Sequence, residues 1–125
     1  MEQIFVAIAA SLAGLAVAAG AFASHALRNH LSDRALEIFE TAVKYQMYHA
    51  LALLLVALLI ARATTVPNTL IAAGYAFISG IIIFSGSLYG LSLSGIKWLG
   101  AVTPLGGVAF LLGWGCLAAS ALSYK

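Results

Sequence analysis

Four apolar segments of about twenty residues each constrain the fold of this sequence more than any other feature, because that is the length a helix needs to cross a bilayer. Hydrophobic residues make up 63% of the 125 residues, charged residues make up 8%, and the mean hydropathy is +1.05. A soluble domain would carry roughly 25% charged residues. The sequence therefore predicts an all-α integral membrane protein, with one domain over residues 1–125 that forms a four-helix bundle.

The expected transmembrane helices cover about residues 4–24, 33–62, 69–93 and 104–123. Ser32 is a suitable N-cap for the second helix, whose charged first turns would lie in the headgroup region. Pro67 separates the second and third segments. Pro104 is expected in the first turn of the fourth helix, where a missing amide N–H costs little.

Short connections make consecutive helices antiparallel, which predicts an up-down-up-down topology. The end of the first helix, the start of the second, the end of the third and the start of the fourth then share one membrane face. Four basic residues belong to that face and two to the other; they are Arg28, Arg34, Lys44 and Lys97, against Arg62 and Lys125. Cytoplasmic loops are enriched in Lys and Arg. We therefore expect both termini outside the cytoplasm, with the bundle in an inner or plasma membrane.

The charged and reactive residues exclude several classes of function. Six Lys/Arg against four Asp/Glu give a net charge of +2, too little for the basic surface that nucleic-acid binding requires. Cys116 is the only cysteine, so no intrachain disulfide forms. The three histidines lack the spacing of a metal site, and no catalytic triad or carboxylate pair is evident. We expect no metal, no cofactor and no enzymatic activity. The start Met1-Glu2-Gln3 lacks the positive charge of a signal peptide and a long uncharged run follows it, which does not favour a cleaved signal peptide.

Polar residues gather toward one membrane face of the expected bundle, whereas the other half is almost wholly apolar. An unpaired polar group in a bilayer costs several kcal/mol, so this one-sided distribution needs a cause. We interpret it as a pocket bounded by His49, Gln46, Tyr89 and Ser85, with His25 turned inward from the end of the first helix. The candidate ligand-binding residues are His25, Tyr45, Gln46, His49, Ser85, Ser87, Tyr89 and Thr103.

Other interpretations of these residues stay open. The tyrosines are also typical of side chains that anchor helix ends at headgroup level, and the serines of side chains that bond their own backbone or a neighbouring helix. Small residues permit close approach of helices, both at Gly86 and Gly90 and at Ala10, Gly14 and Ala18. Packing inside the bundle is the simplest reading of these small residues, and a homodimer is the alternative.

Four strings along the chain together resemble one family. They are GAFASHAL at 20–27, AVKYQMYHALALLL at 42–55, GIIIFSGSLYGLSLSG at 80–95 and TPLGGVAFLLGW at 103–114. In this order they resemble domain of unknown function 423, a family of small bacterial membrane proteins similar to eukaryotic transmembrane protein 256. The resemblance implies a four-helix inner or plasma membrane protein and directs attention to the candidate residues above, but it implies no mechanism.

Three functions follow from these observations. The first is a binding protein that holds a lipid head group or another small amphipathic ligand at the polar end of the bundle. The second is an accessory or assembly subunit of a larger membrane complex, in which the motif residues only lock helices together. The third is a transporter or channel formed by an oligomer, since a single bundle offers no continuous polar path. A membrane lipid, a second copy or another membrane protein are the expected partners.

Overall fold

The computed structural model describes all 125 residues and confirms the all-α membrane bundle. Its helices are α1 (Glu2–His25), α2 (Asp33–Arg62), α3 (Asn68–Gly80), α4 (Gly86–Ser94) and α5 (Leu99–Ser120), with a short 3₁₀ turn, η1 (Leu27–Asn29), between the first two. A π-helical segment, η2 (Ile81–Ser85), joins α3 to α4 without a break, so that the chain has four helices long and apolar enough to cross a membrane.

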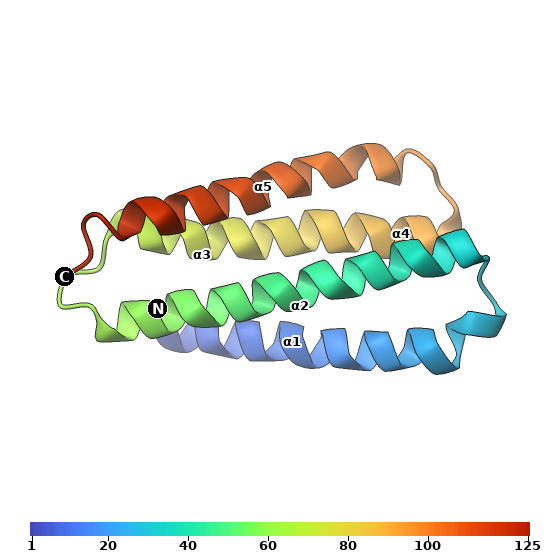
Figure 1. Cartoon of the computed structure of the whole chain (residues 1–125), viewed down its shortest axis with the longest axis horizontal. Coiled ribbons are helices and arrows are strands. Elements are labelled where there is room, and N and C mark those ends of the chain that lie inside the picture. The colour runs from blue at the N-terminus through green and yellow to red at the C-terminus, as the bar shows by residue number, and fades with distance from the viewer.

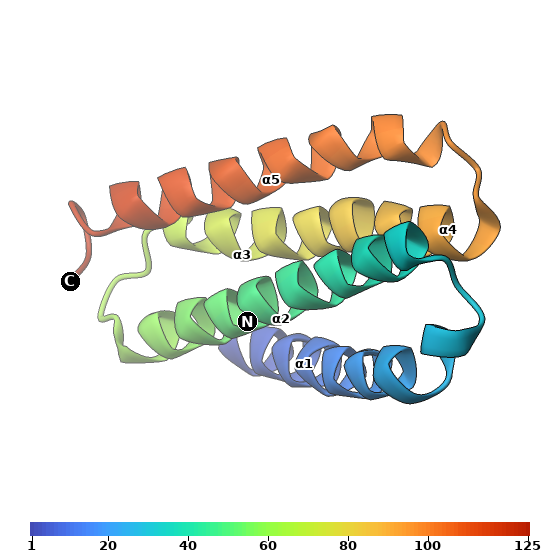
Figure 2. The same cartoon turned by 45° about the vertical axis from the view of Figure 1, so that its right-hand side comes forward.

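The helices run antiparallel in the order α1, α2, the α3–α4 rod and α5, with both termini toward the same end of the bundle (Figure 1). In both views α2 and the α3–α4 rod lie inside, and α1 and α5 lie on the outside (Figures 1 and 2). Burial agrees with this order, since 44% of the apolar window of α2 is buried but only 17% of those of α1 and α5. The two outer helices therefore turn most of their surface toward the bilayer.

Local chemistry explains three of the helix ends. The side chain of Ser32 accepts a hydrogen bond from the backbone N–H of Ala35 at 3.1 Å, so Ser32 is the N-cap of α2. Pro67 precedes α3 in an extended conformation. Gly95 ends α4 in the left-handed region, with φ of 71°, which glycine adopts without the steric cost of a Cβ.

The fourth membrane helix differs from the prediction at both ends. It begins at Leu99 and not near residue 104, and it ends at Ser120 and not near 123. Pro104 therefore lies inside the helix, in its second turn. The predicted start gave proline too much weight: the preceding residues 99–103 are compatible with a helix, and a transmembrane helix tolerates the loss of one backbone hydrogen bond.

The π-helical segment is a feature that the sequence pattern does not predict. It contains Ser85, whose hydroxyl donates to the carbonyl oxygen of Ala42 in α2 at 2.8 Å. It also contains Phe84, whose backbone contacts Gly106 of α5 so closely that a Cβ at Gly106 would lie 2.7 Å from the Phe84 Cα. This irregular turn is therefore the point at which the inner rod is fixed to both α2 and α5.

Phenylalanine rings packed on glycines hold the α3–α5 interface together. Phe77 of α3 covers Gly113 of α5, and Phe110 of α5 covers Gly80 at the end of α3. Each glycine leaves room for a ring where a Cβ would collide with it. The glycine expected to pack between helices at Gly86 instead faces open space, so that part of the packing prediction is wrong.

Candidate functional site

His49, near the middle of α2, is buried with both of its ring nitrogens hydrogen-bonded. Its Nδ1 lies 2.7 Å from the carbonyl oxygen of Tyr45, one helical turn earlier. The indole N–H of Trp114 in α5 donates to Nε2 at 3.1 Å. Because a carbonyl only accepts and an indole N–H only donates, Nδ1 carries the proton and Nε2 is the acceptor. The two bonds thus assign one neutral tautomer to His49.

Aromatic rings surround the imidazole. Phe110 stacks on it with a centroid separation of 3.5 Å and an interplanar angle of 9°. Phe77 and Trp114 approach it with centroid separations of 5.7 Å and 5.9 Å. These contacts, together with a 5% exposed surface, fix the orientation of the ring.

A groove between α2 and α5 lies over this aromatic cluster, with a volume of about 620 Å³. We call it the α2–α5 groove; its lining consists of Tyr45, Tyr48, His49, Phe84, Pro104, Gly107, Val108, Phe110, Leu111 and Trp114. Most of these side chains are apolar. The hydroxyl groups of Tyr45 and Tyr48 bond to no other residue of the chain, and both side chains are exposed. The groove is therefore almost wholly apolar, with Tyr45 and Tyr48 among its lining residues and their hydroxyls without a partner in the chain.

Gln46 lies on a different side of α2 from this groove. It contacts α1 and also Tyr89 of α4. The Tyr89 hydroxyl donates to Gln46 Oε1 at 2.6 Å, and Gln46 Nε2 donates to the carbonyl oxygen of Leu12 at 2.7 Å. This chain joins α4, α2 and α1 at the base of a second groove of about 460 Å³, which Ser85 also lines. It does not reach His49.

The single pocket expected from the sequence is therefore wrong: the structure separates its residues into two grooves on different sides of α2. Tyr45 and His49 lie on the side that faces α5, and Gln46 lies on the side that faces α1. Adjacent residues such as Tyr45 and Gln46 are about 100° apart around a helix. Their closeness in sequence consequently does not bring them to one cavity.

Ser87 and Thr103 form a third polar contact, between α4 and α5. Their hydroxyl oxygens are 2.6 Å apart, and each hydroxyl also lies within hydrogen-bond distance of a carbonyl in its own helix, that of Phe84 for Ser87 and that of Leu99 for Thr103. This arrangement fits the interpretation that these hydroxyls bond their own backbone and a neighbouring helix.

His25 does not turn inward, contrary to the prediction. It is the last residue of α1 and is exposed, and it lines neither groove. The 3₁₀ turn η1 follows almost directly, so His25 stands at the end of α1 and not within the bundle.

Sequence reasoning missed the α5 partners of His49. Phe110 and Trp114 are four residues apart and so share a face of α5, which is a detectable signal. That signal is weak, because α5 is apolar on every side.

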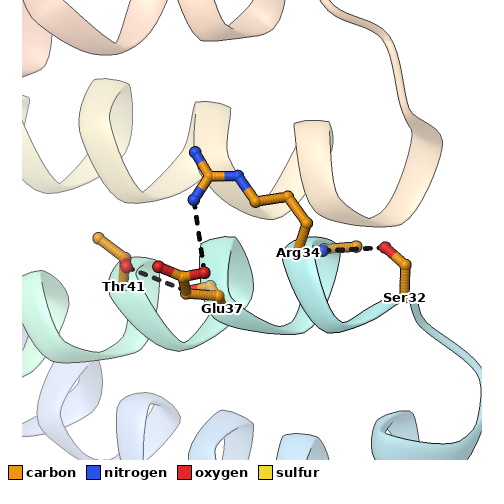
Figure 3. Close-up of polar contacts among 5 residues, drawn as sticks. Ser32, Arg34, Glu37 and Thr41 are labelled. Atoms are coloured by element: carbon orange, nitrogen blue, oxygen red, sulfur yellow. Dashed lines mark hydrogen bonds and ion pairs between the residues drawn. The ribbon is translucent and has the colours of Figure 1, made fainter.

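Charged residues at the start of α2 form a separate surface (Figure 3). A guanidinium nitrogen of Arg34 lies 3.4 Å from a carboxylate oxygen of Glu37, and both side chains are well exposed. Thr41 donates to the backbone carbonyl of Glu37 at 3.0 Å. Such an exposed pair contributes little to stability. No group of three or more His, Cys, Asp or Glu side chains in the chain is arranged to hold a metal ion.

Comparisons with known proteins identify the family of this chain. The family described as Protein of unknown function (DUF423) matches residues 19–107. UPF0382 membrane protein YwdK of Bacillus subtilis is 43% identical over 122 residues, which cover 98% of both chains. A UPF0382 membrane protein of Staphylococcus epidermidis is 42% identical with the same coverage. UPF0382 membrane protein SAB0533 of Staphylococcus aureus is 45% identical over 112 residues, covering 90% of this chain and 89% of its own.

No solved structure matches the chain. The names of the relatives state a membrane location and no activity. The four membrane-crossing helices described above agree with that location, and the resemblance seen in the sequence motifs is confirmed. This chain is a small multi-pass membrane protein and belongs to the DUF423 family.

Proposed function

We propose that this protein binds a membrane lipid or another small amphipathic molecule in the α2–α5 groove. The observation that carries the proposal is the groove itself, an apolar groove of about 620 Å³ between two membrane-crossing helices, with Tyr45 and Tyr48, whose hydroxyls have no partner in the chain, among its lining residues. Ligand sites are usually cavities of about 300–1,000 Å³ with mostly apolar walls and a few polar groups.

The distribution of polarity suggests how such a ligand lies. Lys44 is exposed and stands one helical turn before Tyr48, so the two side chains lie on the same side of α2, toward the charged end of the bundle. Val108 and Leu111 line the wall on α5. We assign the polar end of the ligand to the side of Tyr48 and Lys44, and its apolar part to the wall formed by α5.

The remaining polar candidates have a different role in this proposal. Gln46, Ser85, Ser87 and Thr103 each bond to a neighbouring helix, which uses much of their capacity for hydrogen bonds. We assign them to the locking of helices and not to the ligand. The proposal is that of a binding protein without a catalytic step.

A substitution that fills the groove tests this proposal. In Leu111→Trp the larger side chain occupies the cavity, whereas Leu112→Trp makes the same change at a neighbouring exposed position that does not line it. Native mass spectrometry of protein extracted in a mild detergent measures the retained lipid. We expect a stoichiometric added mass in the wild type and in Leu112→Trp, and its loss in Leu111→Trp. Equal retention in both variants, or no added mass in the wild type, would refute the proposal.

A second function, that of an accessory or assembly subunit, is favoured by the exposed surface of α1. Gly14 has nothing within 4 Å of the position of a Cβ, and Ala7, Ser11 and Ala18 on the same side of the helix are exposed too. Small residues let membrane helices approach closely. A partner of this kind would co-purify after mild solubilisation, whereas a species of constant single-chain mass would contradict it.

A transporter or channel formed by an oligomer is a third function, which flux into liposomes tests.

We further propose that the protein lies in the cell membrane with both termini outside the cytoplasm. Support comes from the basic residues, of which Arg28 and Lys97 belong to the two connections at the end of the bundle away from the termini (Figure 1). In a Cys116→Ala background, a membrane-impermeant maleimide should label Thr64→Cys in intact cells, but Asn29→Cys only after lysis. The reverse pattern would contradict this orientation.

A further inference from the structure

We infer that the α2–α5 groove prefers an amphipathic alcohol, a molecule with a hydroxyl that donates a hydrogen bond, over a molecule of the same shape that only accepts one. The inference rests on the proposed function, because it names the chemical class of the ligand for the same groove. Its basis is the direction of the two hydrogen bonds at His49.

The first of these bonds is built into α2. His49 Nδ1 bonds to the carbonyl oxygen of Tyr45 at 2.7 Å, four residues earlier in the same helix, so both partners are fixed by one rigid element. Stacking on Phe110 at 3.5 Å holds the ring plane. A ring flip would place carbon where Nδ1 now bonds, and the Tyr45 carbonyl would lose this bond. Nδ1 therefore keeps its proton, and Nε2 has only a lone pair to offer.

The second bond is one that a ligand can replace. Trp114 supplies the N–H that Nε2 now accepts, at 3.1 Å. Unlike the buried His49, Trp114 is 44% exposed, and its side chain lines the groove. Trp114 is therefore the partner that can turn toward the bilayer, while the buried His49 stays in place. A ligand that takes its place must bring its own donor, because a buried acceptor without a partner is costly.

This requirement separates ligand classes. The hydroxyl of a long-chain alcohol, a polyprenol or a monoacylglycerol donates to Nε2 and restores its bond. An ether, an ester carbonyl or a hydrocarbon chain does not, and it leaves either Nε2 unpaired or Trp114 in place. The hydroxyls of Tyr45 and Tyr48 have no partner in the chain and can donate to an oxygen of either class of ligand, so they favour polar ligands in general and do not create this preference.

The test compares two probes that differ in one hydrogen-bond donor, 1-hexadecanol and hexadecyl methyl ether. Binding of each is measured by native mass spectrometry on protein in lipid nanodiscs, for the wild type and for Trp114→Phe and His49→Phe. We expect the wild type to prefer the alcohol by about tenfold, the lower part of the range that one unpaired partner produces. Trp114→Phe removes the competing donor and should raise the affinity for the alcohol but not for the ether. His49→Phe should abolish the preference.

An independent measurement covers the case in which His49→Phe does not fold. In the wild type labelled with ¹⁵N-histidine, the two-bond ¹⁵N–¹H couplings distinguish the Nδ1–H from the Nε2–H tautomer. The Nε2–H tautomer would overturn the inference, as would equal affinity for the two probes in the wild type. If both probes bind equally and Leu111→Trp releases them, the inference fails and the proposed function stands. If the wild type retains neither probe nor a native lipid, the proposed function fails as well.

Discussion

The contact between Gly106 and the π-helical segment predicts a large effect from the smallest of substitutions, Gly106→Ala. A Cβ at Gly106 would lie 2.7 Å from the Cα of Phe84, whereas carbon atoms pack at about 3.5–4.0 Å. The obstacle is backbone, which cannot rotate away as a side chain does. Relief requires α5 to move from the inner rod by about 1 Å, the difference between those two separations.

The magnitude follows from a matched control at the next residue. Gly107→Ala places the same methyl group in open space, with nothing within 4 Å. Both changes gain about 1 kcal/mol of helix propensity, so the difference between the two variants isolates the collision. Overpacking costs about 1–3 kcal/mol, and we expect the upper part of that range because the whole helix must shift.

The assay is reversible unfolding from detergent micelles with increasing mole fraction of sodium dodecyl sulfate, followed by tryptophan fluorescence and far-ultraviolet circular dichroism. Gly106→Ala should unfold at a clearly lower mole fraction than the wild type, whereas Gly107→Ala should match or exceed it. Equal midpoints for the two variants would refute the close approach of α5 to Phe84, and with it the role given to the π-helical segment.

Three further changes test other contacts by the same unfolding measurement. Gly113→Ala should destabilise the bundle by about 1–3 kcal/mol, because its Cβ would lie 2.6 Å from the buried Phe77 ring. The control Gly115→Ala places its Cβ where nothing lies within 4 Å and should not destabilise the bundle. Equal stabilities of the two variants would contradict the packing of the Phe77 ring on Gly113. Ser85→Ala should cost about 0.6 kcal/mol and at most about 1.7, through loss of its bond to α2, and a loss above 3 kcal/mol would show that Ser85 does more. Tyr124→Phe removes the hydroxyl that donates to the Leu59 carbonyl at 2.8 Å, so a loss of about 1 kcal/mol is expected, and an unchanged midpoint would show that this bond adds nothing.

The four membrane helices could be predicted because the bilayer imposes their length and composition: only helices and closed β-barrels satisfy the backbone in hydrocarbon, and continuous apolar segments of this length are typical of helices. The start of α2 could also be predicted, because the Ser32 side chain accepts a hydrogen bond from a free backbone N–H whatever the rest of the fold does. The start of α5 could not be predicted in this way. Pro104 is a local signal, and it does not show whether the residues before it are already helical.

The candidate site was harder to predict because spacing along one helix says which residues share a face, but not which neighbour that face meets. Gln46 and His49 are three residues apart and were placed in one pocket, yet the first meets α1 and the second meets α5. The partner Trp114 lies on a helix that is apolar all round, so hydrophobic periodicity gives that helix no orientation. Only the packing of the bundle decides these pairings.

Saturation of hydrogen bonds gives a physical criterion for dividing the polar residues into structural and functional groups. In hydrocarbon an unpaired polar group costs several kcal/mol, so each must find a partner somewhere. Ser85 and Gln46 find theirs in neighbouring helices, so each polar side chain is bonded without any second molecule. The hydroxyls of Tyr45 and Tyr48 do not, and their partners must come from outside the chain, as interfacial water, lipid or ligand. Because these two tyrosines line the same groove as His49, an outside molecule bound in that groove lies beside the two residues whose hydroxyls lack a partner in the chain.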